Sequence, residues 1–165
     1  MASNTRLSTA AGATALVAGA AMIAGAILAG AIAGPVSDLP GRWAGFGSIK
    51  MSSGETEQMR CVATYFVEGS GVKQNLRCAS ASYKIDATAN LTIANGQVSG
   101  DWEEKVWSQT GSISGRMVDN GFNLTINGPG FTAALAMTTT NCKQSLSITP
   151  RGYEVSSISM SLGKC

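Results

Sequence analysis

Residues 83–93 read YKIDATANLTI, and this stretch decides the fold class. Apolar side chains occupy every odd position from Tyr83 to Ile93, and polar side chains occupy the even positions between them. Successive side chains on a strand point to opposite faces of a sheet, so a period of two predicts a strand with one buried and one solvated face. A helix would need apolar residues three or four positions apart.

The same alternation recurs along the rest of the chain, at residues 122–126, 131–137 and 158–162. No window of about 12 residues past Pro40 fits a helix better than a strand. Gly-containing turn signals separate the alternating segments, although their spacing is looser than that of a typical sandwich or barrel, so some turns must lack a clear signal. The turn signals lie at residues 52–55, 68–71, 95–96, 119–121, 127–130 and 150–152.

Residues 41–165 are therefore expected to form one all-β domain, an antiparallel meander of about nine to ten strands. A single flat sheet of that size would leave an apolar face and two edges open, so we expect a closed or strongly curled barrel, with a β-sandwich as the alternative. The side chains expected to point inward are Trp43, Ile49, Cys61, Ala63, Leu76, Ile85, Leu91, Ile93, Phe122, Leu124, Phe131, Leu135, Ile158 and Met160.

The N-terminus has the features of an export signal. Arg6 precedes a charge-free run from Ala10 to Ala33, and the run ends in Ala31-Ile32-Ala33, which has the small residues that signal peptidase requires. We expect a helical signal peptide over residues 1–33 and a short linker over residues 34–40. The alternative is an uncleaved membrane anchor, because the run is long enough to span a bilayer. The β domain is then periplasmic or secreted from a bacterium, or held outside an inner membrane.

Four cysteines remain after the leader, and an even number in an exported chain predicts disulfides. Four cysteines allow three connectivities. If residues 68–71 form a four-residue hairpin loop, counting outward places Cys61 opposite Cys78, near bonding distance. Cys142 and Cys165 are then partners by elimination, which fastens the C-terminus to a turn.

Several classes of function find no support in the sequence. A net charge of +2 without a block of like charges argues against nucleic-acid binding. The chain has no histidine, which removes the common catalytic triads and the usual zinc sites. The acidic cluster at residues 101–104 fits the solvated face of a strand better than a catalytic site. The Ser-x-x-Lys sequences at residues 70–73 and 161–164 are best explained as chance matches to a catalytic motif. We predict no catalytic residue, no metal ligand and no cofactor.

Two resemblances extend this interpretation. Gly41-Arg42-Trp43 at the start of a β-meander resembles the Gly-x-Trp opening of lipocalins and other calycins. The resemblance implies a barrel with Trp43 closing one end and a mouth that takes small apolar ligands. The chain departs from that family because no late helix and no basic residue on the last strand is clearly placed to cover Trp43.

The second resemblance spans most of the β domain. The segments 43–47 and 100–103, together with Glu57, Cys61, Tyr65 and Cys78, are similar to small exported proteins of proteobacteria that have no assigned role. That similarity implies an exported β-protein and no particular chemistry.

The expected function is non-enzymatic, with Trp43, Trp102 and Phe122 as candidate ligand-binding residues. The expected partner is a small apolar ligand or another envelope protein, and a membrane only if the leader is uncleaved. Ligand binding requires a dry cavity inside the barrel, whereas an interaction module requires an exposed apolar patch or an open sheet edge. An enzyme of unrecognised type is the third possibility.

The leader hypothesis has a direct test. Exported protein should begin close to Gly34 on N-terminal sequencing, because cleavage follows the small residues 31–33. Recovery of the full-length chain from membranes would contradict cleavage and support the anchor.

Overall fold

A computed structural model describes residues 34–165. The predicted signal peptide or anchor, residues 1–33, lies outside the described residues. Within the described part, no helix is long and apolar enough to cross a membrane.

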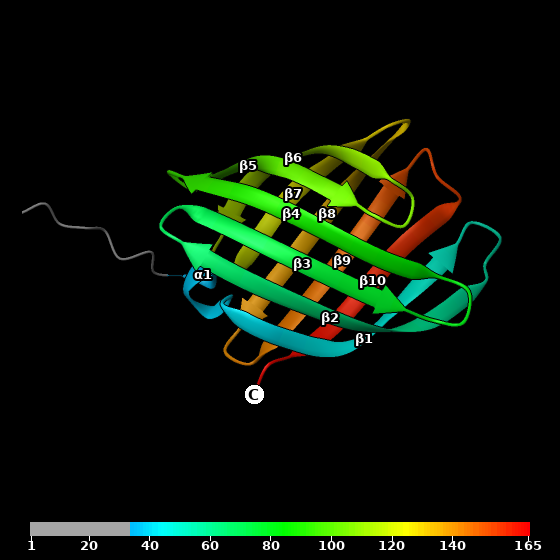
Figure 1. The fold of residues 1–165 in the computed structure, drawn as a ribbon, viewed down its shortest axis with the longest axis horizontal. Helices are drawn as coiled ribbons and strands as arrows, with labels where there is room; N and C mark the ends of the chain where they lie inside the picture. Colours follow the sequence, from blue (N-terminus) through cyan, green and yellow to red (C-terminus); the bar gives the residue numbers. More distant parts are fainter. Residues whose placement is uncertain (1–33) are drawn as a thin grey trace, which may run out of the picture. The chain divides into compact units, whose positions relative to one another are not determined.

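Residues 34–165 contain one short helix and ten antiparallel strands in simple up-and-down order (Figure 1). Each strand pairs with its neighbours in the sequence, as expected from the run of alternating segments and short turns. The elements are α1 (Pro35–Asp38), β1 (Gly41–Met51), β2 (Thr56–Glu68), β3 (Gly71–Ala79), β4 (Lys84–Ala94), β5 (Gln97–Glu104), β6 (Gln109–Val118), β7 (Gly121–Gly128), β8 (Phe131–Thr140), β9 (Lys143–Arg151) and β10 (Val155–Gly163).

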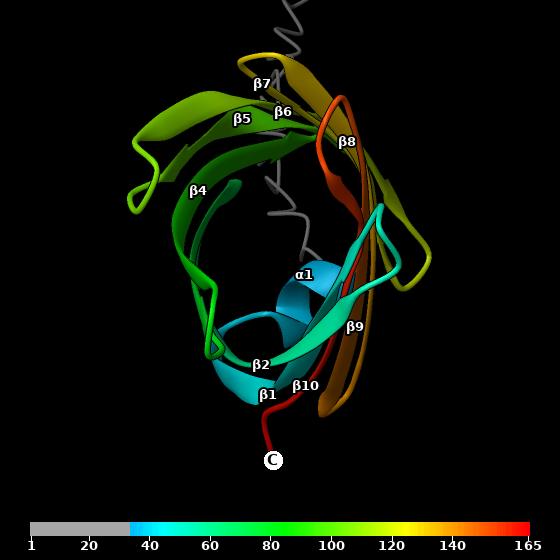
Figure 2. The same cartoon turned by 90° about the vertical axis from the view of Figure 1, so that its right-hand side faces the viewer.

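The sheet closes because β1 pairs with β10 as well as with β2. Ile49 lies opposite Ile158 in that closing ladder, and Gly47 lies opposite Met160. Figure 2 looks along the barrel from one end and shows the strands forming a continuous wall. The predicted all-β meander barrel is confirmed, and the sandwich alternative is not the fold.

The alternation of apolar and polar residues in the sequence determines which side chains point into the barrel and which point outward. Half of the expected inward residues are buried, with exposed fractions between 0% for Trp43 and 8% for Leu124. The other half lie at inward register positions and are only partly buried: Leu76, Ile85, Leu91, Ile93, Phe131, Leu135 and Ile158.

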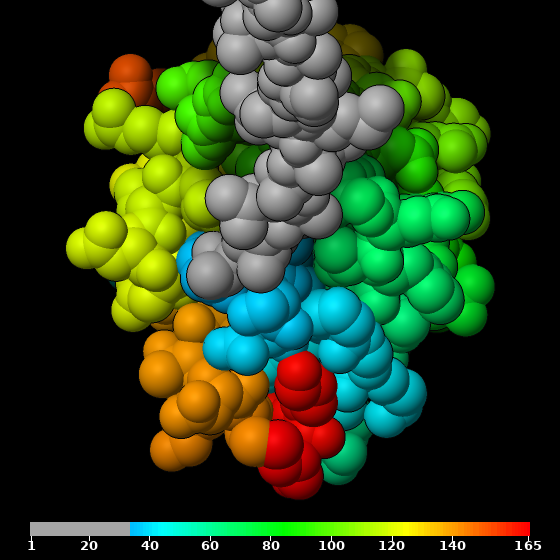
Figure 3. All heavy atoms as spheres, turned by 90° about the vertical axis from the view of Figure 1, so that its left-hand side faces the viewer, coloured from blue at the N-terminus to red at the C-terminus, as the bar shows by residue number. Residues whose placement is uncertain are grey.

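One end of the barrel is closed by α1, which follows Gly34. Val36 and Leu39 are buried against the core, at 2% and 1% exposure. Figure 3 shows this end, with α1 beside the C-terminal residues. Residues 34–40 were expected to form only a linker. They close the barrel instead because the apolar side chains of Val36 and Leu39 can enter it.

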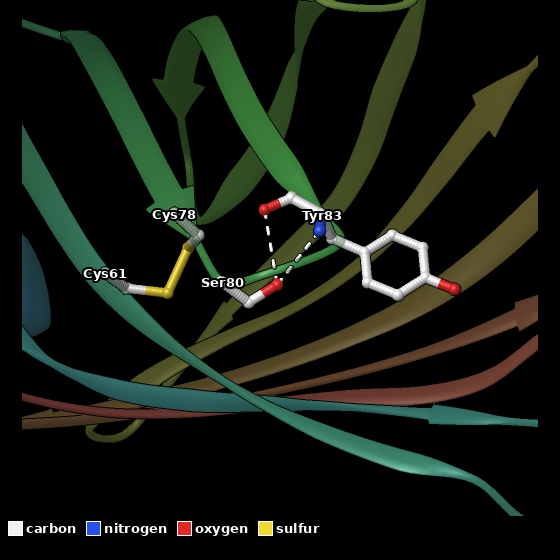
Figure 4. Close-up of a disulfide and its surroundings, with 4 residues drawn as sticks. All are labelled: Cys61, Cys78, Ser80 and Tyr83. Atoms are coloured by element: carbon white, nitrogen blue, oxygen red, sulfur yellow. Dashed lines mark hydrogen bonds between the residues drawn. A yellow bond between two sulfur atoms is a disulfide. The ribbon is translucent and has the colours of Figure 1, made fainter.

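Both predicted disulfides are present. Cys61 bonds to Cys78 across the β2–β3 ladder, with their Cα atoms 4.1 Å apart, and the hairpin register is the predicted one (Figure 4). Cys142, in the β8–β9 turn, bonds to Cys165 at the C-terminus. Two disulfides indicate an oxidising compartment outside the cytoplasm.

Three turns have no Gly-containing signal in the sequence, namely residues 80–83, 105–108 and 141–142. Hydrogen bonds replace the signal in the first of them: Ser80 Oγ accepts from the Tyr83 backbone N–H at 2.9 Å, as Figure 4 shows. In the other two, Ser108 and Asn141 take a positive φ that usually selects glycine.

The two faces of β7 give a stability test. Leu124→Ala should lower the free energy of unfolding by about 2–5 kcal/mol, since Leu124 is buried inside the barrel. Thr125→Ala, at the exposed neighbouring position, should change it by no more than about 0.5 kcal/mol. Urea unfolding of both variants is the measurement, and equal losses would mean that the outer face is also covered.

Candidate functional site

Several apolar side chains that line the barrel lumen are only partly buried. Leu76, Leu91, Ile126 and Ile148 point inward by register, yet each is only partly buried. Eight strands already give an interior just wide enough for side chains or one small ligand, and ten enclose more space. The lumen is therefore the candidate site.

A chain of polar side chains crosses the closed end of the lumen. Gln74 Nε2 donates to the Tyr65 hydroxyl at 2.9 Å, and Tyr65 donates to Gln144 Oε1 at 3.0 Å. Gln144 Nε2 then donates to Thr139 Oγ1 at 3.3 Å. We call these four residues the polar floor. Because they come from β2, β3, β8 and β9, the floor ties opposite walls of the barrel together.

The polar floor is neutral. Burial raises the pKa of the Tyr65 hydroxyl well above its usual value near 10, because the phenolate would lose its hydration inside the barrel. Tyr65 therefore stays protonated and can donate its hydrogen bond. Since the folded pKa lies above the unfolded one, the contribution of Tyr65 to stability is complete below about pH 10 and is lost as pH rises toward the folded pKa.

Trp43 lies at the closed end and is completely buried. Its indole Nε1 donates to the Leu39 carbonyl at 2.8 Å, which fastens α1 to β1. Lys164 Nζ lies 4.8 Å from the centre of the Trp43 ring and also donates to the Asp38 carbonyl.

The expectation that no basic residue covers Trp43 is therefore wrong. Lys164 follows the last residue of β10, and the bond between Cys165 and Cys142 holds the chain end in place.

The opposite end, which we call the mouth, is formed by the loops 52–55, 80–83, 105–108, 129–130 and 152–154. Trp102, Phe131 and Tyr153 form an aromatic row there, with ring centres 5.9 Å and 5.2 Å apart. Trp102 Nε1 donates to the Asn127 carbonyl at 3.0 Å. This bond leaves the apolar part of the indole available to the lumen.

Two glycines make room for that row. A Cβ atom at Gly111 would lie 2.6 Å from Trp102 Nε1, and one at Gly128 would lie 2.3 Å from a ring carbon of Phe131. Side chains at these positions would displace the aromatic rings. The glycines of β6 and β7 therefore fix where the aromatic row stands.

The rim of the mouth carries two consecutive exposed apolar residues, Val106 and Trp107, at 47% and 68% exposure. Their loop is held by Glu104, whose carboxylate accepts from the backbone N–H groups of Asp86 and Trp107. Glu57 holds the neighbouring loop by accepting from Ser82 N–H at 2.9 Å. Hydrogen bonds from Ser80 and Ser82 lower the pKa of Glu57.

The predicted ligand-binding residues are not brought together. Trp102 stands near the mouth, partly exposed, and is the one that faces accessible space. Trp43 and Phe122 are buried at the closed end, with Phe122 paired to Met137 next to Tyr65. They support the floor and expose almost no surface.

Sequence reasoning missed the polar floor. The hairpin register did place Tyr65 opposite Gln74, a pair that weakened the apolar pattern. This polar pair on an otherwise apolar inward face was the sequence signal that could have predicted the polar floor. Thr139 and Gln144 carry no comparable sequence signal, because the contact of Gln144 with Tyr65 depends on closure of the barrel.

The other chemical candidates lie apart from the lumen. Asp101 and Glu103 are exposed on the outer face. Ser70 lies in the β2–β3 turn, and Lys164 covers Trp43. Over residues 34–165, no group of three or more acidic, cysteine or histidine side chains could hold a metal ion.

Open depressions also occur on the outer wall. One of about 830 Å³ crosses β5 to β9 and is lined largely by small polar side chains such as Ser99, Thr125 and Ser147. A second, of about 540 Å³, lies beside Arg42 and Phe66. Both depressions are open to solvent.

Comparison of the chain with known protein families and with curated proteins finds no match. The assignment of a site therefore rests on the geometry of the lumen.

The polar floor yields a stability prediction. Tyr65→Phe should cost about 1–3 kcal/mol, because it leaves polar atoms of Gln74 and Gln144 without their partner. Tyr83→Phe is the matched control: its hydroxyl contacts only Met51 Sδ, at 3.7 Å, so the change should stay within about 0.5 kcal/mol. Urea unfolding near neutral pH measures both. An equal loss of stability in both variants would contradict the structural role assigned to the polar floor.

Proposed function

We propose that this domain is a non-enzymatic carrier that binds a small apolar ligand inside the barrel. The observation that carries the proposal is the set of inward apolar residues, among them Leu91, Ile126 and Ile148, that remain partly accessible within a closed wall. Ligand pockets are typically concave, apolar and provided with a few polar groups that fix orientation. Burial of a ligand there would remove this apolar surface from water.

The asymmetry of the barrel supports one route of access. The closed end is filled by Trp43, Leu39 and the polar floor, so a ligand would pass through the mouth. The aromatic row of Trp102, Phe131 and Tyr153 supplies an apolar wall on that route. Exposed Trp107 on the rim extends the apolar surface outward.

The second candidate is an envelope interaction module. The observation that favours it is the exposure of Phe46 and Phe66 on the outer face, at 58% and 55%. The guanidinium of Arg60 already covers Phe46 at 5.2 Å, which reduces the apolar surface on offer. Closure of β1 against β10 removes the open edge that strand addition would need. We therefore prefer ligand binding to the interaction module as the proposed function.

The proposed location is the bacterial periplasm or the extracellular medium. The two disulfides favour an oxidising compartment, and the charge-free run before Gly34 has the pattern of an export signal. The resemblance of Gly41-Arg42-Trp43 to the calycin opening agrees with a carrier.

A fluorescent apolar probe, N-phenyl-1-naphthylamine, tests lumen binding. The wild-type domain should enhance its fluorescence saturably. Ala87→Phe places a ring in the lumen and should weaken binding at least about tenfold, because a pocket filled by side chain excludes the probe.

Ala134→Phe makes the same change at an exposed outer position of β8 and should leave the dissociation constant within about twofold. Thermal unfolding should show that both variants remain folded. Absence of saturable binding by the wild type, or equal weakening by both variants, would reject the carrier function.

A further inference from the structure

Building on the proposed carrier function, we propose that the lumen selects a neutral amphiphile whose polar end is a hydrogen-bond donor, a hydroxyl group in the simplest case. The polar end would sit on Gln74 at the polar floor, and the apolar tail would extend toward the mouth. The feature that points to this ligand class is an unused acceptor on an otherwise satisfied polar chain.

The hydrogen bonds of the floor run in one direction, from Gln74 through Tyr65 and Gln144 to Thr139. Each inner member is nearly inaccessible, with exposed fractions of 4% for Tyr65, 1% for Gln144 and 3% for Thr139. Gln74 is different because it is only partly buried. It is therefore the member of the floor that a ligand can reach.

Gln74 uses its amide nitrogen to donate to Tyr65, which orients its amide oxygen away from that bond. Among the hydrogen bonds of the described residues, none uses Gln74 Oε1 as an acceptor. Every buried side-chain nitrogen and oxygen of this part of the chain has a partner, so Oε1 must be accessible. Because Gln74 pairs with Tyr65 and Ala89 on the inward face, that accessible space belongs to the lumen.

The inward residues of β4 beside Gln74 have small side chains. Ala89 lies directly opposite on β4, and Ala87 is the next inward residue toward the mouth. Leu91, on the other side of Ala89, is partly exposed. Small side chains beside a polar group provide space for a head group against an apolar wall.

The charge of the lumen selects against an anionic head group. In the described strands, the charged residues at inward positions are Glu57 and Glu104, both near the mouth and both bound to loop N–H groups. Lys164 faces Trp43 and the Asp38 carbonyl at the closed end. A carboxylate placed at Gln74 would meet an oxygen acceptor without a cation and would lose its hydration.

Displacement of N-phenyl-1-naphthylamine at pH 8 by three ligands with unbranched tails of nine or ten carbons tests the selection. The ligands are 1-decanol, decyl methyl ether and sodium decanoate. Decanol should bind about three- to tenfold more tightly than the ether, the ratio expected for one neutral hydrogen bond. Decanoate should bind more weakly than decanol. The ether is the more apolar of the neutral pair, so a purely apolar lumen would prefer it or show no difference.

Gln74→Leu should remove the preference for decanol over the ether while the probe still binds, because it deletes the acceptor and keeps the volume. Asn75→Leu changes the next residue of β3, whose side chain bonds Thr88 on the outer face, and should retain the preference. Probe binding with equal affinity for all three ligands in the wild type, or with decanoate preferred, would overturn the head-group assignment alone. Absence of probe binding by the wild type would reject the carrier function and this inference with it.

Discussion

The structure depends on the pairing of β1 with β10. Before this contact forms, the meander has two open edges and an apolar face larger than one sheet can cover. Once β1 and β10 pair, every strand has two neighbours, and the apolar face of the sheet encloses the interior of the barrel. The glycines of β1 permit the contact, since a Cβ atom at Gly45 would lie 2.1 Å from the Ser161 carbonyl oxygen of β10.

Closure also determines what each end of the barrel can do. The C-terminus returns beside the start of β1, which brings Lys164 over Trp43 and lets the bond between Cys142 and Cys165 fix it there. Trp43 in turn holds α1 through the Leu39 carbonyl. The closed end is thus assembled from both termini of the described domain. At the mouth, carboxylates at the rim hold the loops instead.

The polar floor shows why an inward polar residue need not destabilise an apolar barrel. Each buried partner in the chain from Gln74 to Thr139 is satisfied, so burial incurs little net loss. Tyr65 connects the two sides of the floor because its ring spans the interior between opposite walls of the barrel. The same arrangement leaves the amide oxygen of Gln74 outside the hydrogen-bonded chain of the floor.

The sequence by itself determined the local features of the domain. Alternation from Tyr83 to Ile93 and its repeats predicted strands and faces, and the hairpin at residues 68–71 predicted the register that joins Cys61 to Cys78, because these depend on neighbours close along the chain. The contacts of Lys164 with Trp43 and of Tyr65 with Gln144 join residues 121 and 79 positions apart. Only the tertiary structure decided them, because such pairs meet only when the sheet closes on itself.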